Sequence, residues 1–148
     1  MRYATLVAAP AHAAARLLGD LSSWPLLFQR VERIELLVGR EPEVLARIWV
    51  RERGGLADFT CRCRPAENAA GLVLEFVVTR PPLTELTVRW TVTPQGAWQS
   101  VVEVAYEFRV IGDAPEAIGR LQPEFARISD WDLRSIKEMV ELNGFAGT

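Results

Sequence analysis

The chain has 148 residues, 49% of them hydrophobic and 24% charged, and its 17 basic and 19 acidic side chains leave a formal net charge of -2. This length predicts one domain, residues 1–148, with a sizeable buried core, and the near-neutral balance excludes a basic nucleic-acid surface. One His and two Cys exclude a His-rich or four-ligand zinc site. No Gly-rich phosphate loop or nucleophile elbow occurs, so we expect neither metal nor cofactor.

The expected location is the cytoplasm, without a membrane span. No segment approaches the ~20 apolar residues that a spanning helix needs, and the run Ala4–Ala15 is too short and too mixed for a secretory signal. Cys61 and Cys63 lie two residues apart on an expected strand, where side chains do not bridge easily. Reduced cysteines of this kind are typical of cytoplasmic proteins.

The first elements are a strand and two short helices. Arg2–Ala8 alternates weakly and predicts a strand. Pro10 is expected to open a helix that Gly19 ends. Ser22 or Ser23 is then expected to cap a second short helix by accepting a hydrogen bond from its first turn.

The middle of the chain is expected to form a sheet and the end a long helix. Between Val31 and Val110 apolar residues alternate with period two, in six segments separated by short turns, which predicts an antiparallel meander with one buried face. A last helix is expected from Pro115 to Leu142, bent or interrupted at Pro123. The predicted class is therefore α+β, with a curved sheet whose concave face this helix covers.

One carboxylate stands out on the long helix. At 100° per residue, Asp132 falls in the middle of an apolar stripe formed by Leu121, Phe125, Ile128, Ile136 and Met139. Burial would raise the pKa of such a carboxyl group, as in a general acid. Alternatively, Pro123 rotates the helix and leaves Asp132 at the rim or bound to an arginine.

The second set of candidates lies on the rows that should face this helix. They are either ordinary core or the lining of a cavity for a flat apolar ligand, with Tyr106 and Asp132 as its few polar groups. The set comprises Phe59, Cys61, Phe76, Trp90 and Tyr106.

Several segments resemble the polyketide cyclase/aromatase family of the START-like superfamily. The most specific is Asp20–Leu37, which contains Trp24-Pro25 and Phe28. The loop Arg80-Pro81-Pro82-Leu83, the strand ending Val88-Arg89-Trp90, Tyr106-Glu107-Phe108 and Ile136–Val140 are also similar. The resemblance implies a helix-grip fold: a seven-stranded curved antiparallel sheet around a long C-terminal helix, with two short helices after the first strand, enclosing a cavity.

The resemblance and the alternation disagree about one arginine. Relatives commonly direct an arginine into the cavity from the strand that corresponds to Phe59–Arg64, and the Arg64-x-x-Glu67 spacing aligns it with Arg64. The alternation of the strand instead directs Cys63 inward and Arg64 outward, and a shift of one residue would exchange them. The acid and the tyrosine that some relatives carry after Trp-Pro are replaced by Arg30 and Val31.

The implied function is a cofactor-independent cyclase/aromatase of antibiotic biosynthesis, which folds a poly-β-keto chain in the cavity and closes a ring by aldol reaction with dehydration. Asp132 or Arg64 would be the acid/base group, and Tyr106 would orient a carbonyl. The alternative is a non-catalytic carrier of a lipid, quinone or other apolar molecule. An acyl carrier protein is a candidate partner, and the chain would be a monomer or homodimer. The expected substrate-binding residues are Trp24, Phe28, Phe59, Cys61, Phe76, Trp90, Phe125 and Ile128.

Overall fold

The computed structural model describes residues 1–40, 43–52, 54–67, 70–77, 83–113 and 115–146, so the loop Arg80-Pro81-Pro82 lies outside the described residues. In this part, seven strands form one antiparallel sheet with the order β1-β7-β6-β5-β4-β3-β2. This confirms the expected succession of a strand, two short helices, six strands and a long helix. The strands are β1 (Arg2–Val7), β2 (Val31–Arg40), β3 (Glu43–Glu52), β4 (Gly55–Pro65), β5 (Ala70–Phe76), β6 (Leu83–Pro94) and β7 (Ser100–Val110).

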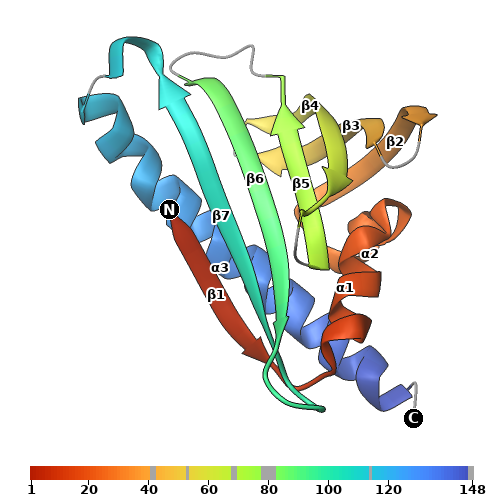
Figure 1. Ribbon diagram of the computed structural model, residues 1–148. Coiled ribbons are helices and arrows are strands. Elements are labelled where there is room, and N and C mark those ends of the chain that lie inside the picture. The colour runs from red at the N-terminus through yellow and green to blue at the C-terminus, as the bar shows by residue number, and fades with distance from the viewer. Residues whose placement is uncertain (41–42, 53, 68–69, 78–82, 114, 147–148) are drawn as a thin grey trace.

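The sheet curves around the long helix α3 (Pro115–Ala146), which runs along the face formed by β1, β7 and β6 (Figure 1). The strands β2, β3 and β4 turn away from it toward α1 and α2. Alternation explains the arrangement, because every second residue from Leu86 to Val92 and from Val102 to Phe108 is apolar and lies in or against the core. The inner rows of β6 and β7 thus pair Val88 with Tyr106 and Trp90 with Val104.

The two short helices, α1 (Ala11–Gly19) and α2 (Trp24–Leu27), lie at one end of the sheet, with a 3₁₀ turn over Leu21–Ser23 between them. The expected serine cap of the second helix is wrong: Ser23 precedes α2 without a side-chain capping bond. The hydroxyls of Ser22 and Ser23 both donate to the Asp20 carboxylate, at 2.6 Å. These charge-assisted bonds hold both hydroxyls at Asp20 rather than at the first turn of α2.

The long helix is continuous through Pro123, so of the expected bend or interruption only the interruption is wrong, and it extends past Leu142 to Ala146, so the expected stop is wrong. Its C-terminal half is fixed to the connection between β1 and α1. There, Lys137 Nζ donates to the Leu6 carbonyl at 2.9 Å, and the Ala8 N–H donates to Glu141 at 3.0 Å. Tertiary contacts of this kind, rather than local propensity, hold most protein helices. No helix in the described ranges is long and apolar enough to cross a membrane.

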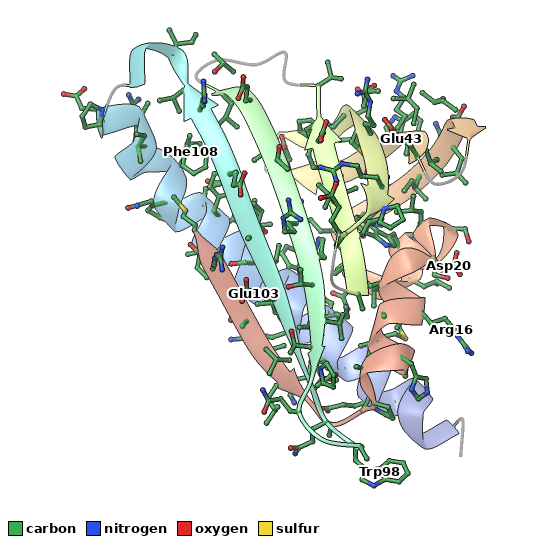
Figure 2. All side chains as sticks on the ribbon, viewed as in Figure 1. Arg16, Asp20, Glu43, Trp98, Glu103 and Phe108 are labelled. Carbon is green, nitrogen blue, oxygen red and sulfur yellow. The ribbon has the colours of Figure 1, made fainter. Side chains whose placement is uncertain are left out.

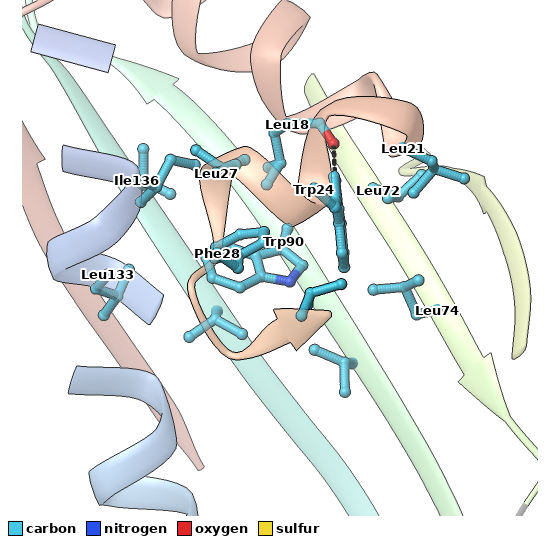
Figure 3. Packing of buried hydrophobic residues seen from close by; sticks show 14 of the residues in the cluster. Leu18, Leu21, Trp24, Leu27, Phe28, Leu72, Leu74, Trp90, Leu133 and Ile136 are labelled. Carbon is cyan, nitrogen blue, oxygen red and sulfur yellow. Dashed lines mark hydrogen bonds between the residues drawn. The ribbon is translucent and has the colours of Figure 1, made fainter. Parts of the chain in front are cut away.

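Three aromatic rings fill the core beneath α2 (Figure 3). The Phe28 ring lies 4.9 Å from Trp24 and 5.4 Å from Trp90, between centroids, and the Trp24 indole N–H donates to the Leu18 carbonyl at 2.9 Å. The position of Trp90 depends on a close approach of the strands β5 and β6. Gly71 has φ +142°, and a Cβ there would stand 1.9 Å from the Trp90 carbonyl oxygen, so this position requires glycine.

Candidate functional site

A pocket of about 60 Å³ lies between the end of α2, the middle of the sheet and α3. One water molecule needs roughly 10–15 Å³ on this scale. The pocket therefore holds a few waters, and an extended keto chain needs its aromatic walls to move apart. Apolar and aromatic side chains form most of its surface, with polar groups from the α2–β2 connection, β7 and α3. The lining residues are Trp24, Phe28, Arg30, Val31, Leu74, Phe76, Val88, Trp90, Tyr106 and Asp132.

The first polar element of the pocket is a buried ion pair between α3 and the α2–β2 connection. The Arg30 guanidinium donates to Asp132 through its Nη2 at 2.9 Å and, more weakly, through Nε at 3.4 Å. The Asp132 side chain is 7% exposed and that of Arg30 is 20% exposed. Burial raises the pKa of Asp132 above its usual value, and the neighbouring Arg30 opposes this rise without cancelling it. Burial acts to lower the pKa of Arg30, but Asp132 keeps it above its usual value.

The second polar element is the phenol of Tyr106. Its ring stacks on Phe125 of α3, with centroids 4.8 Å apart, and this contact fixes where the hydroxyl points. Burial, and then the charge of Asp132, raise the pKa of Tyr106, so the phenol remains protonated at neutral pH. Among the described residues, no side chain or backbone group hydrogen-bonds this hydroxyl, although the residue is 6% exposed. None of the fully buried side-chain oxygen and nitrogen atoms in the described ranges lacks a partner, so this hydroxyl must border the open space of the pocket, where a ligand can accept from it.

The predicted lining residues form two groups, one at the surface of the pocket and one away from it. Trp24, Phe28, Phe76 and Trp90 lie at its surface, whereas four other predicted residues do not. Phe125 lies behind Tyr106, and Phe59 packs edge-on against Phe76 at 6.2 Å. Phe108, labelled in Figure 2, also packs against Phe125, with its ring centroid 5.1 Å from that of Phe125. The predicted residues outside the lining are Phe59, Cys61, Phe125 and Ile128.

Arg64 does not reach the pocket. Its guanidinium bonds Glu75 at 3.3 Å on the outer face of the sheet and lies 3.9 Å from Glu67. Cys63, the next residue on β4, is 1% exposed and faces the core. The structure therefore follows the alternation of the strand, and the expectation that Arg64 enters the cavity is corrected.

The two cysteines form a buried pair of free thiols, with their sulfur atoms 3.5 Å apart. The hydrogen bond to Cys63 and burial raise the pKa of Cys61, which keeps its thiol protonated. Neither thiol lines the pocket. In the described ranges, no cluster of three or more His, Cys, Asp or Glu residues is placed to hold a metal ion.

Arg30 is the polar pocket residue that sequence reasoning missed, and the apolar ones are Val31, Leu74 and Val88. Arg30 lies between a helix and a strand, where no periodicity assigns a direction to a side chain, and its partner Asp132 is 102 residues away. The available signal was the Trp24-Pro25 segment itself, since the resemblance aligns Arg30 with an acid that some relatives carry.

Comparison with known proteins assigns the fold and the family. The sequence model of the family described as polyketide cyclase/dehydrase and lipid transport matches residues 1–141. The bifunctional cyclase/dehydratase of the granaticin polyketide synthase of Streptomyces violaceoruber is 25% identical over 137 residues, which cover 91% of this chain and 42% of that protein. The chain thus spans less than half the length of this curated relative.

Solved structures agree. The crystal structure of the di-domain ARO/CYC protein BexL, of the BE-7585A biosynthetic pathway, superposes with a TM-score of 0.87 at 25% identity, covering 96% of this chain and 46% of that one. The Zhui aromatase/cyclase of Streptomyces sp. R1128 gives 0.82 at 20% identity, covering 95% and 92%. A START superfamily protein of Mycobacterium smegmatis gives 0.70 at 19%, covering 95% and 97%. The START-like fold is confirmed, and the chain belongs to the polyketide cyclase/dehydrase and lipid transport family.

Proposed function

We propose that the protein is a cyclase/aromatase that closes a ring in a poly-β-keto chain by aldol reaction and dehydration, without a cofactor. One observation carries the proposal: the unbonded hydroxyl of Tyr106 and the ion pair of Asp132 with Arg30 line the same small, mostly apolar pocket. This set contains a hydrogen-bond donor for a carbonyl and a base whose ionised form has a counter-ion. Those are the two groups that an aldol reaction requires.

Asp132 would act as the base. Its carboxylate takes a proton from a carbon between two carbonyl groups, and the electron pair of that C–H bond moves into the enolate. Arg30 supports this role because its permanent positive charge stabilises the ionised carboxylate inside an apolar pocket. The remaining upward shift of the pKa of Asp132 makes it a stronger base than an exposed aspartate.

Tyr106 would activate the second carbonyl. Its hydroxyl donates to the carbonyl oxygen, the enolate carbon forms the new C–C bond, and Tyr106 gives its proton to the resulting alkoxide. The proton on Asp132 then passes to the Tyr106 phenolate, which restores both groups. In the dehydration, Asp132 takes a proton from the nucleophilic carbon while the hydroxyl group leaves as water with a proton from Tyr106. Stabilising the oxygen that gains charge is a large part of such catalysis. Proton return from Asp132 to Tyr106 through the pocket closes the cycle.

The substrate is expected to be a neutral, apolar keto chain. Among the described lining residues the one cation, Arg30, is already paired with Asp132, so this part of the lining offers no free charge to hold a carboxylate. We therefore expect delivery as a thioester on an acyl carrier protein. Trp24, Phe28 and Trp90 would then bend the chain, since their rings occupy the volume beside the polar groups.

The test is a reconstituted minimal polyketide synthase, with products identified by liquid chromatography and mass spectrometry. Addition of this protein should change the product from spontaneously cyclised material to a single dehydrated aromatic compound. Tyr106→Phe removes only the hydroxyl and should lower this product by about 100-fold, as for the loss of a positioned acid. Tyr3→Phe is the matched control, because Tyr3 packs edge-on against Tyr106 at 6.2 Å and does not line the pocket.

Two results would overturn the proposal. If Tyr106→Phe and Tyr3→Phe give the same product yield as the parent protein, the hydroxyl takes no part in the reaction. If the protein leaves the product mixture unchanged but retains the chain or a quinone on gel filtration, the carrier alternative is correct.

A further inference from the structure

One residue of the neighbouring strand, Arg51, makes three contacts with the chain segment that brings Arg30 into the pocket. The Arg51 backbone N–H donates to the Arg30 carbonyl at 2.8 Å. Its side chain then reaches across, with Nη1 donating to the Gln29 carbonyl at 2.7 Å and Nη2 pairing with the Glu32 carboxylate. Arg51 thus contacts Gln29 before Arg30, Glu32 after it, and Arg30 itself.

The same place has an irregular strand pairing. In β2 and β3, Val31 pairs with Val50 but Arg33 pairs with Trp49, so Glu32 is an extra residue in β2. An insertion of this kind is a β-bulge, which bends a strand and redirects a side chain, and bulges are frequent next to active sites. Glu32 is therefore turned toward Arg51. The strand that contains the bulge, β2, begins immediately after Arg30.

We propose that Arg51 is a positioning residue: its exposed side chain, on the outside of the molecule, fixes the backbone at residues 29–32 so that Arg30 reaches Asp132. The inference rests on the proposed function, because it concerns the same site. The Arg51 side chain is 59% exposed, so an ion pair there contributes little to overall stability. Its two bonds to the segment 29–32 instead reduce the freedom of the short connection that carries Arg30.

The consequence is measurable at Asp132. Charged and titratable groups that act there are Arg30 from the α2–β2 connection and Tyr106 from β7, while Glu52 of β3 acts on Arg30 and Tyr3 of β1 acts on Tyr106. Of these, Arg30 alone favours the ionised carboxylate of Asp132. When Arg30 moves away, burial dominates and Asp132 should ionise at a higher pH.

The experiment compares Arg51→Ala, Arg51→Lys and Arg62→Ala. Arg62 is the matched control, since it is 61% exposed and pairs with the exposed Glu43 (labelled in Figure 2) across the outer face of β3 and β4. Carbon-13 NMR titration of the Asp132 carboxyl carbon needs no substrate, and product formation by the reconstituted synthase is measured across the same pH range. Thermal unfolding of each variant reports folding.

Arg51→Ala should move the Asp132 titration and the acid limb of product formation to higher pH, and should lower the rate about tenfold at the acid side, as for a misplaced catalytic group. Arg51→Lys keeps the pair with Glu32 but has no second nitrogen to reach Gln29. Its titration and its rate should therefore lie between those of Arg51→Ala and the parent protein. If Arg51→Ala titrates like Arg62→Ala, the positioning role is wrong. A further variant, Arg30→Gln, separates this role from the proposed function. If Arg30→Gln also leaves product formation unchanged, the proposed function itself fails. If Arg30→Gln shifts the Asp132 titration and Arg51→Ala does not, only the role of Arg51 is overturned.

Discussion

The two members of the buried ion pair should respond unequally to removal. Asp132→Asn leaves the Arg30 guanidinium in the pocket without a counter-ion, and arginine remains charged at any pH at which the protein is folded. Arg30→Gln leaves a carboxyl group that is able to bind a proton and become neutral. We therefore predict that Asp132→Asn destabilises the fold more than Arg30→Gln at neutral pH or below.

The magnitude follows from the burial of each group. Removing one partner of a buried pair costs about 3–5 kcal/mol, and the lower end applies because the Arg30 side chain is 20% exposed. At ~3 kcal/mol, the unfolding midpoint of a chain of this size falls by roughly 6–12 °C. Arg30→Gln should cost about 1 kcal/mol under acidic conditions, the usual value of a lost hydrogen bond.

The cost of Arg30→Gln should grow with pH. In the folded variant the pKa of Asp132 lies further above its usual value than in the parent protein, because burial raises it and Arg30 no longer opposes the rise. The folded state then binds the proton more tightly than the unfolded chain does. The associated stability is complete below the unfolded pKa, and it declines by up to about 1.4 kcal/mol per pH unit until the pH passes the folded pKa.

Urea unfolding of both single variants and of Arg30→Gln/Asp132→Asn, at several pH values, measures these differences. The double variant puts two neutral amides in the pocket and should recover about 2 kcal/mol relative to Asp132→Asn, a coupling expected of groups in contact. The description of this pair as a buried, charge-compensated one would be refuted by two results together. Both single variants would lose the same free energy of unfolding at every pH, and the two losses would add up in the double variant.

Three further outcomes concern the pocket walls and the core. Gly71→Ala should destabilise by more than about 3 kcal/mol in urea unfolding, because its Cβ would meet the Trp90 carbonyl oxygen at 1.9 Å, whereas Gly96→Ala meets no atom within 4 Å. Phe28→Ala should cost about 3–5 kcal/mol and should admit a fluorescent apolar probe that the parent protein excludes, as measured by titration. Cys61 and Cys63, which are 0% and 1% exposed, should react with a thiol reagent only at the rate of unfolding, whereas rapid native-state labelling would show that the core opens locally.

Periodicity was sufficient to predict the architecture because each strand buries one face. The row of β7 that includes Tyr106 was assigned to the interior from alternation alone, and the apolar stripe of α3 identified Asp132 as a buried carboxylate. The same rule placed Cys63 inward and Arg64 outward, against the alignment with relatives. A physical constraint on every second side chain proved stronger than a loose motif, since reversing it would expose the whole apolar row.

The parts that sequence could not predict depend on contacts between distant residues. The ion pair of Arg30 with Asp132 joins a connection to a helix, and no local pattern encodes that meeting. The serine cap failed for a related reason, because both hydroxyls are held at the Asp20 carboxylate rather than at the first turn of α2. The pocket size depends on how Trp24, Phe28 and Trp90 pack together. Each case is a competition between partners that only the folded chain brings together.

The pairing of Asp132 with Arg30 also answers how a chain with one His would perform proton transfer. A carboxylate in an apolar pocket normally becomes protonated and is then useless as a base. A lysine partner would lose its own charge on burial, but the guanidinium keeps it, and its planar fork contacts both carboxylate oxygens. Arg30 therefore opposes protonation of Asp132, while burial leaves its pKa above that of an exposed aspartate. Because this balance depends on the contact between Arg30 and Asp132, the proposed positioning of Arg30 by Arg51 would serve the same proton transfer.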